Sequence, residues 1–193
     1  MGAGDAKPEM PCLVAPVVDY HASFLAALAE YHAEGRHLEL PADLLADPGE
    51  FGRYVAALRA GATDPLAPDR YVWSLSGVWP ADQSPETYVP HTVLWWTAGA
   101  QYLGRLNIRH ELNEDLLRGG GHIGYEVRPG ALRQGHATAM LAAALRMAAA
   151  LGIDPARVDC EVDNVASRRV IEKNGGVLDE ERDGTLYFWV PTK

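Results

Sequence analysis

The chain has 193 residues and a formal net charge of −9 at pH 7. This length suits one domain that buries about two-thirds of its unfolded surface without disulfides or metals, so we expect a single domain over residues 1–193. The acidic balance argues against a nucleic-acid partner, because phosphates are bound by clustered Lys and Arg. It weakly favours a cationic substrate.

The cysteines and the terminal segment bear on compartment and metal binding. The two cysteines, Cys12 and Cys160, show no CxxC spacing, so neither a disulfide framework nor a zinc site is indicated. The N-terminus lacks the basic and apolar regions of a signal peptide. The apolar run 137–151 is interrupted by Arg146 and is shorter than the roughly 18 residues of a membrane span. We therefore expect a cytoplasmic protein with no metal and no membrane contact.

The first part of the chain, residues 1–90, has a helical pattern. A short apolar stretch at 13–15 is predicted as an edge strand. Apolar residues then recur on one helical face within 20–35, and a second helix is predicted over 48–61. Each helix ends at a glycine, and a proline stands in the first turn of the second one.

Residues 62–90 are rich in proline and contain Trp73 and Trp79. A loop of this length usually binds something rather than only connecting two elements, so we expect a substrate loop here. The alternative is that the two tryptophans only attach the loop to the body of the protein. The stretch 71–75 also has the composition of a partial strand.

Strand patterns dominate the next segment. Residues 91–110 contain two β-branched and aromatic runs around a turn at 97–100, which predicts a hairpin. After a polar segment, residues 121–127 alternate as a strand that Pro129 ends. One face of that strand is predicted to carry Ile123, Tyr125 and Val127, and the other face His122, Gly124 and Glu126.

The stretch RPGALRQGHATAM, residues 128–140, leads from that strand into a helix predicted over 136–151. The first N–H groups of a helix have no internal partner, and the helix dipole makes this end attract phosphate oxygens. Gly135 permits close approach, while Arg133 and Thr138 would add a charge and a hydroxyl. The GxxxxGK[ST] and GxGxxG patterns are absent, so the loop indicates a pyrophosphate site other than that of the usual ATP and NAD motifs. The alternative is a solvent-facing turn.

The C-terminal part completes an α/β pattern. Residues 157–162 are predicted to form a strand parallel to 121–127 through a right-handed crossover. Asn164 stands at the N-cap of a helix over 165–173, and a hairpin covers 177–190. We expect an α/β fold (α+β by some schemes) with a mixed central β-sheet of about six to seven strands flanked by helices. The sheet would lie within residues 91–193.

Two motifs within residues 121–190 resemble the GNAT superfamily of acyl-CoA N-acyltransferases. The family's pyrophosphate loop, [Q/R]-x-x-G-x-[G/A], falls on LRQGHA at 132–137, with Leu132 where Gln or Arg is usual. The stretch NVASRRVIEKNGG is similar to the family's Asn-x-x-[Ala/Ser] helix. Ile171 stands where many members carry a tyrosine that protonates the departing thiolate. This departure brings the helix nearer to the branch that resembles ribosomal-protein N-terminal acetyltransferases.

The resemblance implies acetyl-CoA as a cosubstrate and an amine acceptor, either a small molecule or a protein amino group. The strand end at Tyr125, Glu126 and Val127 would pair its backbone with the pantetheine amides. The other implied cofactor contacts are Arg133, Gln134, Gly135, His136, Ala137, Thr138, Asn164 and Ser167. For Asn164 and Ser167 the alternative is plain helix capping.

Direct attack of an amine on the thioester requires a base, because an alkylamine is mostly protonated at physiological pH. Glu126 is the first candidate, since a partly buried carboxylate at the end of that strand would have a raised pKa. His122 is the second, and His110, Glu111 and Asp159 are further candidates. A salt-bridged Glu126 and a structural His122 are the alternatives. The segment RHELNE does not fit the HExxH zinc pattern.

The sequence therefore favours an acetyl-CoA-dependent N-acetyltransferase. A non-catalytic acyl-CoA-binding sensor or regulatory module is the main alternative, which Leu132 and Ile171 support. A protein that binds another phosphate ligand at the same helix N-terminus is a third. A homodimer is compatible with the sequence.

Overall fold

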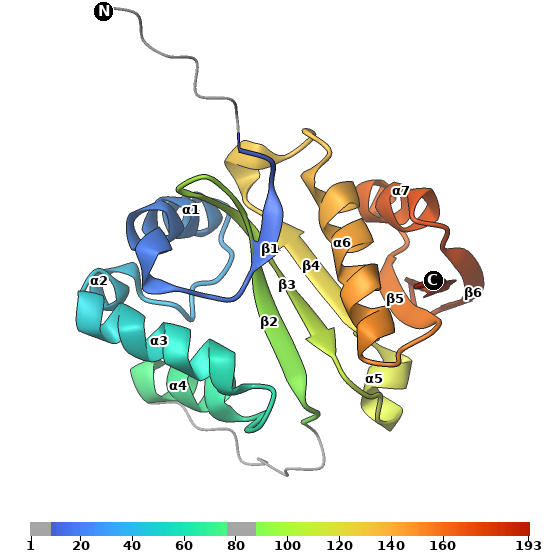
Figure 1. The fold of residues 1–193 in the computed structure, drawn as a ribbon, viewed down its shortest axis with the longest axis horizontal. Coiled ribbons are helices and arrows are strands. Elements are labelled where there is room, and N and C mark those ends of the chain that lie inside the picture. Colours follow the sequence, from blue (N-terminus) through green and yellow to red (C-terminus); the bar gives the residue numbers. More distant parts are fainter. Residues whose placement is uncertain (1–8, 77–87) are drawn as a thin grey trace, which may run out of the picture.

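The computed structural model describes residues 9–76 and 88–193, whose strands form two antiparallel sheets (Figure 1). The four-stranded sheet has the order β1-β2-β3-β4. Its strands are β1 (Cys12–Val14), β2 (His91–Ala98), β3 (Gln101–Arg109) and β4 (Ile123–Val127). The three-stranded sheet has the order β5-β7-β6. Its strands are β5 (Ala156–Glu161), β6 (Val177–Arg182) and β7 (Thr185–Val190).

Helices cover both faces of the four-stranded sheet (Figure 1). The N-terminal layer comprises the 3-10 turn η1 (Val18–Tyr20), α1 (His21–Ala33), α2 (Ala42–Leu45), α3 (Pro48–Ala60) and α4 (Ala67–Ser76). The helices that follow are α5 (Glu114–Arg118), α6 (His136–Ala150) and α7 (Val165–Lys173), with a short 3-10 turn η3 (Pro129–Ala131) before α6. No described helix is long and apolar enough to cross a membrane.

Each face of the sheet has its own hydrophobic core. Trp95 is buried among the aromatic side chains of α1 and α3, and the neighbouring Trp96 is buried with α6 on the opposite face. Successive side chains of a strand point to opposite faces, so adjacent tryptophans serve two cores. The four-stranded sheet is thus the middle layer of the fold.

An irregularity in the β2–β3 pairing sets which side chains of β3 face the N-terminal helices. Trp96 pairs with Gly104 and Thr97 with Tyr102, so Leu103 is an extra residue on β3. A bulge of this kind shifts the alternation of the strand by one position. Beyond the bulge, Leu106 and Ile108 join the core under α6. The residues between and after them therefore face the N-terminal layer.

The two sheets meet at the start of β4 and β5. The His122 N–H donates to the Arg157 carbonyl at 2.7 Å, and the Arg157 N–H donates to His122 Nδ1 at 2.9 Å. Among the described residues no strand ladder continues from this point between β4 and β5. The predicted fold class and strand number are confirmed, and the sheet divides where two parallel neighbours were expected.

The main correction concerns residues 62–90. The expected partial strand at 71–75 is wrong, because these residues belong to α4. Pro68 and Asp69 stand in the first turn of this helix, where a fixed φ and a negative charge are both favourable. The Tyr71 hydroxyl donates to the Glu50 carbonyl at 2.9 Å, which holds α4 against α3. The rest of the expected loop, residues 77–87 with Trp79, lies outside the described residues.

Close packing of β3 on β4 makes Gly104 a sensitive position. A Cβ built there would lie 2.2 Å from the Glu126 carbonyl oxygen. We expect Gly104→Ala to lower the free energy of unfolding by about 1–3 kcal/mol. Gly52, inside α3, has no atom within 4 Å of such a Cβ, so Gly52→Ala should raise it by about 0.5–1 kcal/mol. Urea unfolding of both variants checks this, and an unchanged midpoint for Gly104→Ala would contradict the packing described.

Candidate functional site

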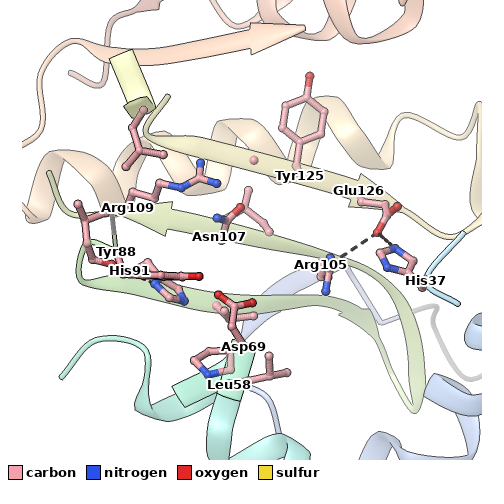
Figure 2. Close-up of a pocket in the computed structure, with 16 residues that line it drawn as sticks. His37, Leu58, Asp69, Tyr88, His91, Arg105, Asn107, Arg109, Tyr125 and Glu126 are labelled. Atoms are coloured by element: carbon pink, nitrogen blue, oxygen red, sulfur yellow. Dashed lines mark hydrogen bonds and ion pairs between the residues drawn. The ribbon is translucent and has the colours of Figure 1, made fainter. Parts of the chain in front are cut away.

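A cavity of about 570 Å³ opens on the face of β2, β3 and β4 that carries the N-terminal helices (Figure 2). Its floor is formed by Arg105, Asn107 and Arg109 of β3 together with Gly124 and Glu126 of β4. Side chains of α3, α4 and α5 contribute to its walls, as do residues 88–89. The segment 62–90 therefore does contribute to the site, through its described residues.

The register between β3 and β4 explains the polar floor. Arg105 pairs with Glu126, and Asn107 pairs with Gly124. A Cβ at Gly124 would lie 2.6 Å from Asn107 Oδ1, so only glycine leaves room for the amide of Asn107. The alternation predicted for residues 121–127 is confirmed, because Ile123 and Val127 are buried on the opposite face.

Glu126 is held in a cluster of basic side chains. His37 Nε2 lies 2.7 Å from Glu126 Oε2, and Arg105 Nε lies 3.6 Å from the same oxygen. Arg36 forms an ion pair with Oε1, and the Glu126 side chain is 18% exposed. Burial raises the pKa of Glu126, but the hydrogen bond from His37 and the charges of Arg105 and Arg36 outweigh it, so the pKa is lowered. The raised pKa expected for this carboxyl is therefore wrong.

Arg36 and His37 come from the turn after α1 and carry no recognisable motif. His37 has a positive φ of 55°, and its ring lies edge-on to Tyr31 with the centroids 4.9 Å apart. Its Nδ1 lies 3.2 Å from Glu39 Oε1. Contacts between residues ninety positions apart leave no signal in one sequence.

Three other candidate bases, His122, His110 and Asp159, form hydrogen bonds within the fold. His122 Nδ1 accepts from the Arg157 N–H, and His122 is not among the residues that line the cavity. Burial, followed by the charge of Arg109, lowers the pKa of His122. His110 Nε2 lies 2.8 Å from Thr92 Oγ1, and Asp159 accepts from the Gly120 N–H at 3.1 Å. Glu111 is exposed.

Asp69 is a functional candidate that sequence reasoning missed. It lies on α4 and faces the cavity from the wall opposite the sheet (Figure 2). Burial raises the pKa of Asp69, and the charges of His91 and Arg105 only partly oppose this effect. Its carboxyl makes no hydrogen bond or ion pair with another described residue. Among the charged side chains of the cavity, this carboxyl most resembles a poised base.

The loop before α6 lies on the other side of β4. Arg133 and Gly135 have positive φ values of 62° and 85°, and residues 132–135 are exposed. No side chain of the described residues caps the helix, and the Ala139 N–H donates to the Gly135 carbonyl at 3.1 Å. The N–H groups of His136, Ala137 and Thr138 are therefore available to an anion.

Two contacts fix this loop to the sheet and to α7. Trp96 Nε1 donates to His136 Nδ1 at 3.2 Å, and Asn174 Nδ2 donates to the Thr138 carbonyl at 3.3 Å. Gln134 Nε2 reaches only the Gly130 carbonyl, at 3.4 Å. The start of α6 is thus anchored while its N–H groups stay open.

The start of α7 approaches β4 across the opening between the sheets. The Asn164 side chain accepts from the Ser167 N–H at 3.0 Å, so the expected N-cap is present. Ser167 Oγ lies 2.7 Å from the Tyr125 hydroxyl. Burial raises the pKa of Tyr125 to about 12, although its bond with Ser167 lowers it. Ile171 is 0% exposed and belongs to the core.

The predicted site residues thus form two groups on either side of β4. Glu126 and Tyr125 both line the cavity, but the Tyr125 hydroxyl lies at Ser167. The other predicted residues are Val127 at the end of β4, residues 133–138 at the start of α6, and Asn164 and Ser167 at the start of α7. Within residues 9–76 and 88–193, no three or more His, Cys, Asp or Glu side chains are grouped to hold a metal ion.

Comparisons with known proteins agree with this architecture. RimJ of Mycobacterium smegmatis, in complex with CoA-disulfide, shares 18% identity at a TM-score of 0.58, covering 95% of this chain and 85% of that one. A putative ribosomal-protein-serine acetyltransferase from Vibrio cholerae shares 12% identity at a TM-score of 0.56, covering 96% and 98%. The protein yncA, a putative acetyltransferase from Salmonella typhimurium with its cofactor acetyl-CoA, shares 13% identity at a TM-score of 0.52. The match covers 95% of this chain and 94% of that one.

At identities this low, the TM-scores show a shared fold alone. No curated protein matches the sequence. The family model described as an acetyltransferase (GNAT) domain matches residues 27–177, which is well over half of the chain. The resemblance drawn from the two motifs is thereby confirmed, and the chain belongs to the GNAT acetyltransferase family.

Proposed function

We propose that this protein is an acetyl-CoA-dependent N-acetyltransferase that moves an acetyl group to a primary amine of a small molecule or a protein. The observation that carries this proposal is the uncapped N-terminus of α6 beside the edge of β4 that parts from β5. Such an N-terminus binds phosphate oxygens, and the free strand edge offers backbone groups to an extended ligand. A cavity lies on the other face of the same strand.

The acetyl-CoA pyrophosphate would lie against Arg133, Gln134, Gly135, His136, Ala137 and Thr138, because the first N–H groups of α6 have no partner within the helix. The pantetheine arm would extend along Tyr125 and Val127 of β4 toward the point where the sheets meet. Asn164 and Ser167 would flank it from α7. The related structures that contain CoA or acetyl-CoA support this assignment.

The acceptor amine would approach from the cavity and attack the thioester directly, with no covalent intermediate on the protein. It must first lose a proton to a base. We assign that role to Asp69, acting through water, because its pKa is raised by burial and its carboxyl forms no ion pair among the described residues. Glu126, whose pKa is lowered by its basic partners, would instead hold Arg36, His37 and Arg105 in place. His122 would have a structural role, joining β4 to β5 through its bonds with Arg157.

The departing thiolate needs a proton, and the buried Ile171 supplies none. The hydroxyl pair of Tyr125 and Ser167 spans the opening between β4 and α7, so we assign proton donation to this pair. Backbone N–H groups near Val127 would stabilise the negative charge that develops on the carbonyl oxygen. The free thiols of Cys12 and Cys160 are compatible with action in a reducing cytoplasm.

Binding of acetyl-CoA at α6 is tested by placing a carboxylate at the start of this helix. Gly135→Asp would repel the pyrophosphate, so we expect acetyl-CoA affinity, measured by calorimetry, to fall at least tenfold. Gly152 follows the same helix, with a φ of 82° against 85° for Gly135, and a Cβ meets no atom within 4 Å at either glycine. Gly152→Asp therefore carries the same charge and similar backbone strain, and should bind within twofold of wild type.

Equal affinities in the two variants would refute this placement of the pyrophosphate. A thiol-release assay over small amines and peptide N-termini then tests turnover. Release with at least one amine supports the enzyme. Tight binding without release from any of them would favour the non-catalytic sensor.

The assignment of the base is tested with Asp69→Asn. Base catalysis typically contributes about 10²–10⁴ in rate, so we expect kcat/KM at pH 7 to fall about 100-fold with acetyl-CoA affinity unchanged. The loss should shrink as the pH rises toward the pKa of the amine, because the free amine needs no base. Asp64, five residues earlier, has a side chain that is 45% exposed and pairs with Arg70, so Asp64→Asn is the matched control. Wild-type rates for Asp69→Asn, together with a large loss for Glu126→Gln, would return the role to Glu126.

A further inference from the structure

Arg109, the last residue of β3, is a cation that lines the cavity. Its Nη1 donates to the Gly120 carbonyl at 2.7 Å and to the Gly121 carbonyl at 3.0 Å. Among the described residues no carboxylate forms an ion pair with it. A guanidinium has five N–H donors, so those of Nε and Nη2 remain unused in the described part of the chain.

Other shielded arginines of this protein are compensated. Arg157 pairs with Asp179 and Glu180, and Arg128 pairs with Glu30. Arg105, which shares the cavity floor, pairs with Glu126. A shielded charge without a counterion costs free energy. The other arginines have carboxylate partners that offset this cost, whereas Arg109 has none among the described residues. This difference points to a ligand of opposite charge at Arg109.

The carboxyls around Arg109 do not supply that charge. Burial lowers the pKa of Arg109, and Asp159 opposes this only in part. Asp159 lies outside the cavity lining and accepts from the Gly120 N–H. Asp69 is influenced by His91 and Arg105 instead. His91, which faces Arg109 across the β2–β3 ladder, has a pKa lowered by burial.

Asn107 extends the polar surface from Arg109 toward β4. The two side chains lie on the same face of β3, two residues apart, which corresponds to about 7 Å along the strand. Figure 2 shows the Arg109 guanidinium directed along the sheet toward Asn107. Asn107 also lies over Gly124, where β4 has no side chain. A group bound by Arg109 is therefore one short linker away from the exposed backbone of β4.

We propose that Arg109 and Asn107 bind an anionic group of the acceptor, a carboxylate or a phosphate, so that the acceptor is an amine that carries its own negative charge. This inference rests on the proposed function, because it describes the acceptor side of the same cavity. Arg109 is thus a specificity residue. The competing explanation is that Arg109 only fastens the glycine-rich turn at 119–121.

The test uses pairs of amines that differ in the anionic group. Suitable pairs are β-alanine with propylamine, O-phosphoethanolamine with ethanolamine, and Ala-Asp with Ala-Asn, the two dipeptides being amidated at the C-terminus so that only the side chain differs in charge. Each compound is titrated by calorimetry into the wild-type protein saturated with CoA and is also assayed for thiol release with acetyl-CoA. We expect the anionic member to bind at least tenfold more tightly in at least one pair. The carboxylate and phosphate pairs identify which anion is preferred.

Variants separate recognition from folding. Arg109→Gln should remove the preference, whereas Arg109→Lys should keep part of it, because the ammonium retains the charge and can still donate to one carbonyl. The matched control is Arg118→Gln, which removes an exposed arginine of α5 outside the cavity lining. It should keep the full preference. CoA affinity measured on every variant reports whether the fold is intact.

Equal binding within every pair, including pairs in which neither member binds, would overturn the inference, as would a preference that survives Arg109→Gln. If Arg109→Gln no longer binds CoA, Arg109→Lys becomes the deciding variant. If Arg109→Lys prefers the anionic amine as strongly as wild type does, Arg109 only holds the turn at 119–121. Failure of thiol release with every amine, while the preference persists in calorimetry, would refute the proposed transferase and leave the anion site standing.

Discussion

The meeting of His122 and Arg157 is the contact on which the rest of the architecture depends. One backbone hydrogen bond and one bond to the His122 ring join the two sheets there. The Arg157 side chain, 5% exposed, is itself held by Asp179 and Glu180 and lies over the rings of Tyr187 and Trp189. Because the ladder stops at this point, one edge of β4 pairs with no strand of the described residues, and α6 starts beside the opening.

Because side chains alternate along β4, neighbouring residues of this strand face the α7 side and the cavity side. Tyr125 points toward α7, and Glu126 points into the cavity beneath the N-terminal helices. An extended ligand at the edge of this strand would meet both sides at once. The bulge in β3 matters for the same reason, since it turns Arg105 toward Glu126. The position of the site follows from strand geometry more than from the helices that cover it.

The local features of this fold could be predicted from the sequence, whereas the contacts between distant segments could not. The alternation of 121–127, the left-handed Gly135 and the Asn164 N-cap are each written within a few residues. The opposite holds for Glu126, whose pKa depends on His37 and Arg36 from a turn far away in the sequence. Asp69 was missed because a proline-rich, aromatic stretch has the composition of a loop as well as that of a helix start.

The overall charge and the charge of the cavity lead to different expectations. A net charge of −9 attracts cations from solution, but salt screens this attraction beyond a Debye length of about 8–10 Å. Inside the cavity Glu126 is paired with basic side chains, whereas Arg109 forms no ion pair with a carboxylate of the described residues. The field of the whole protein and the floor of the cavity therefore select different ends of one molecule. An amine with an anionic group satisfies both, because its ammonium is steered by the acidic surface and its anion is held by Arg109 on contact.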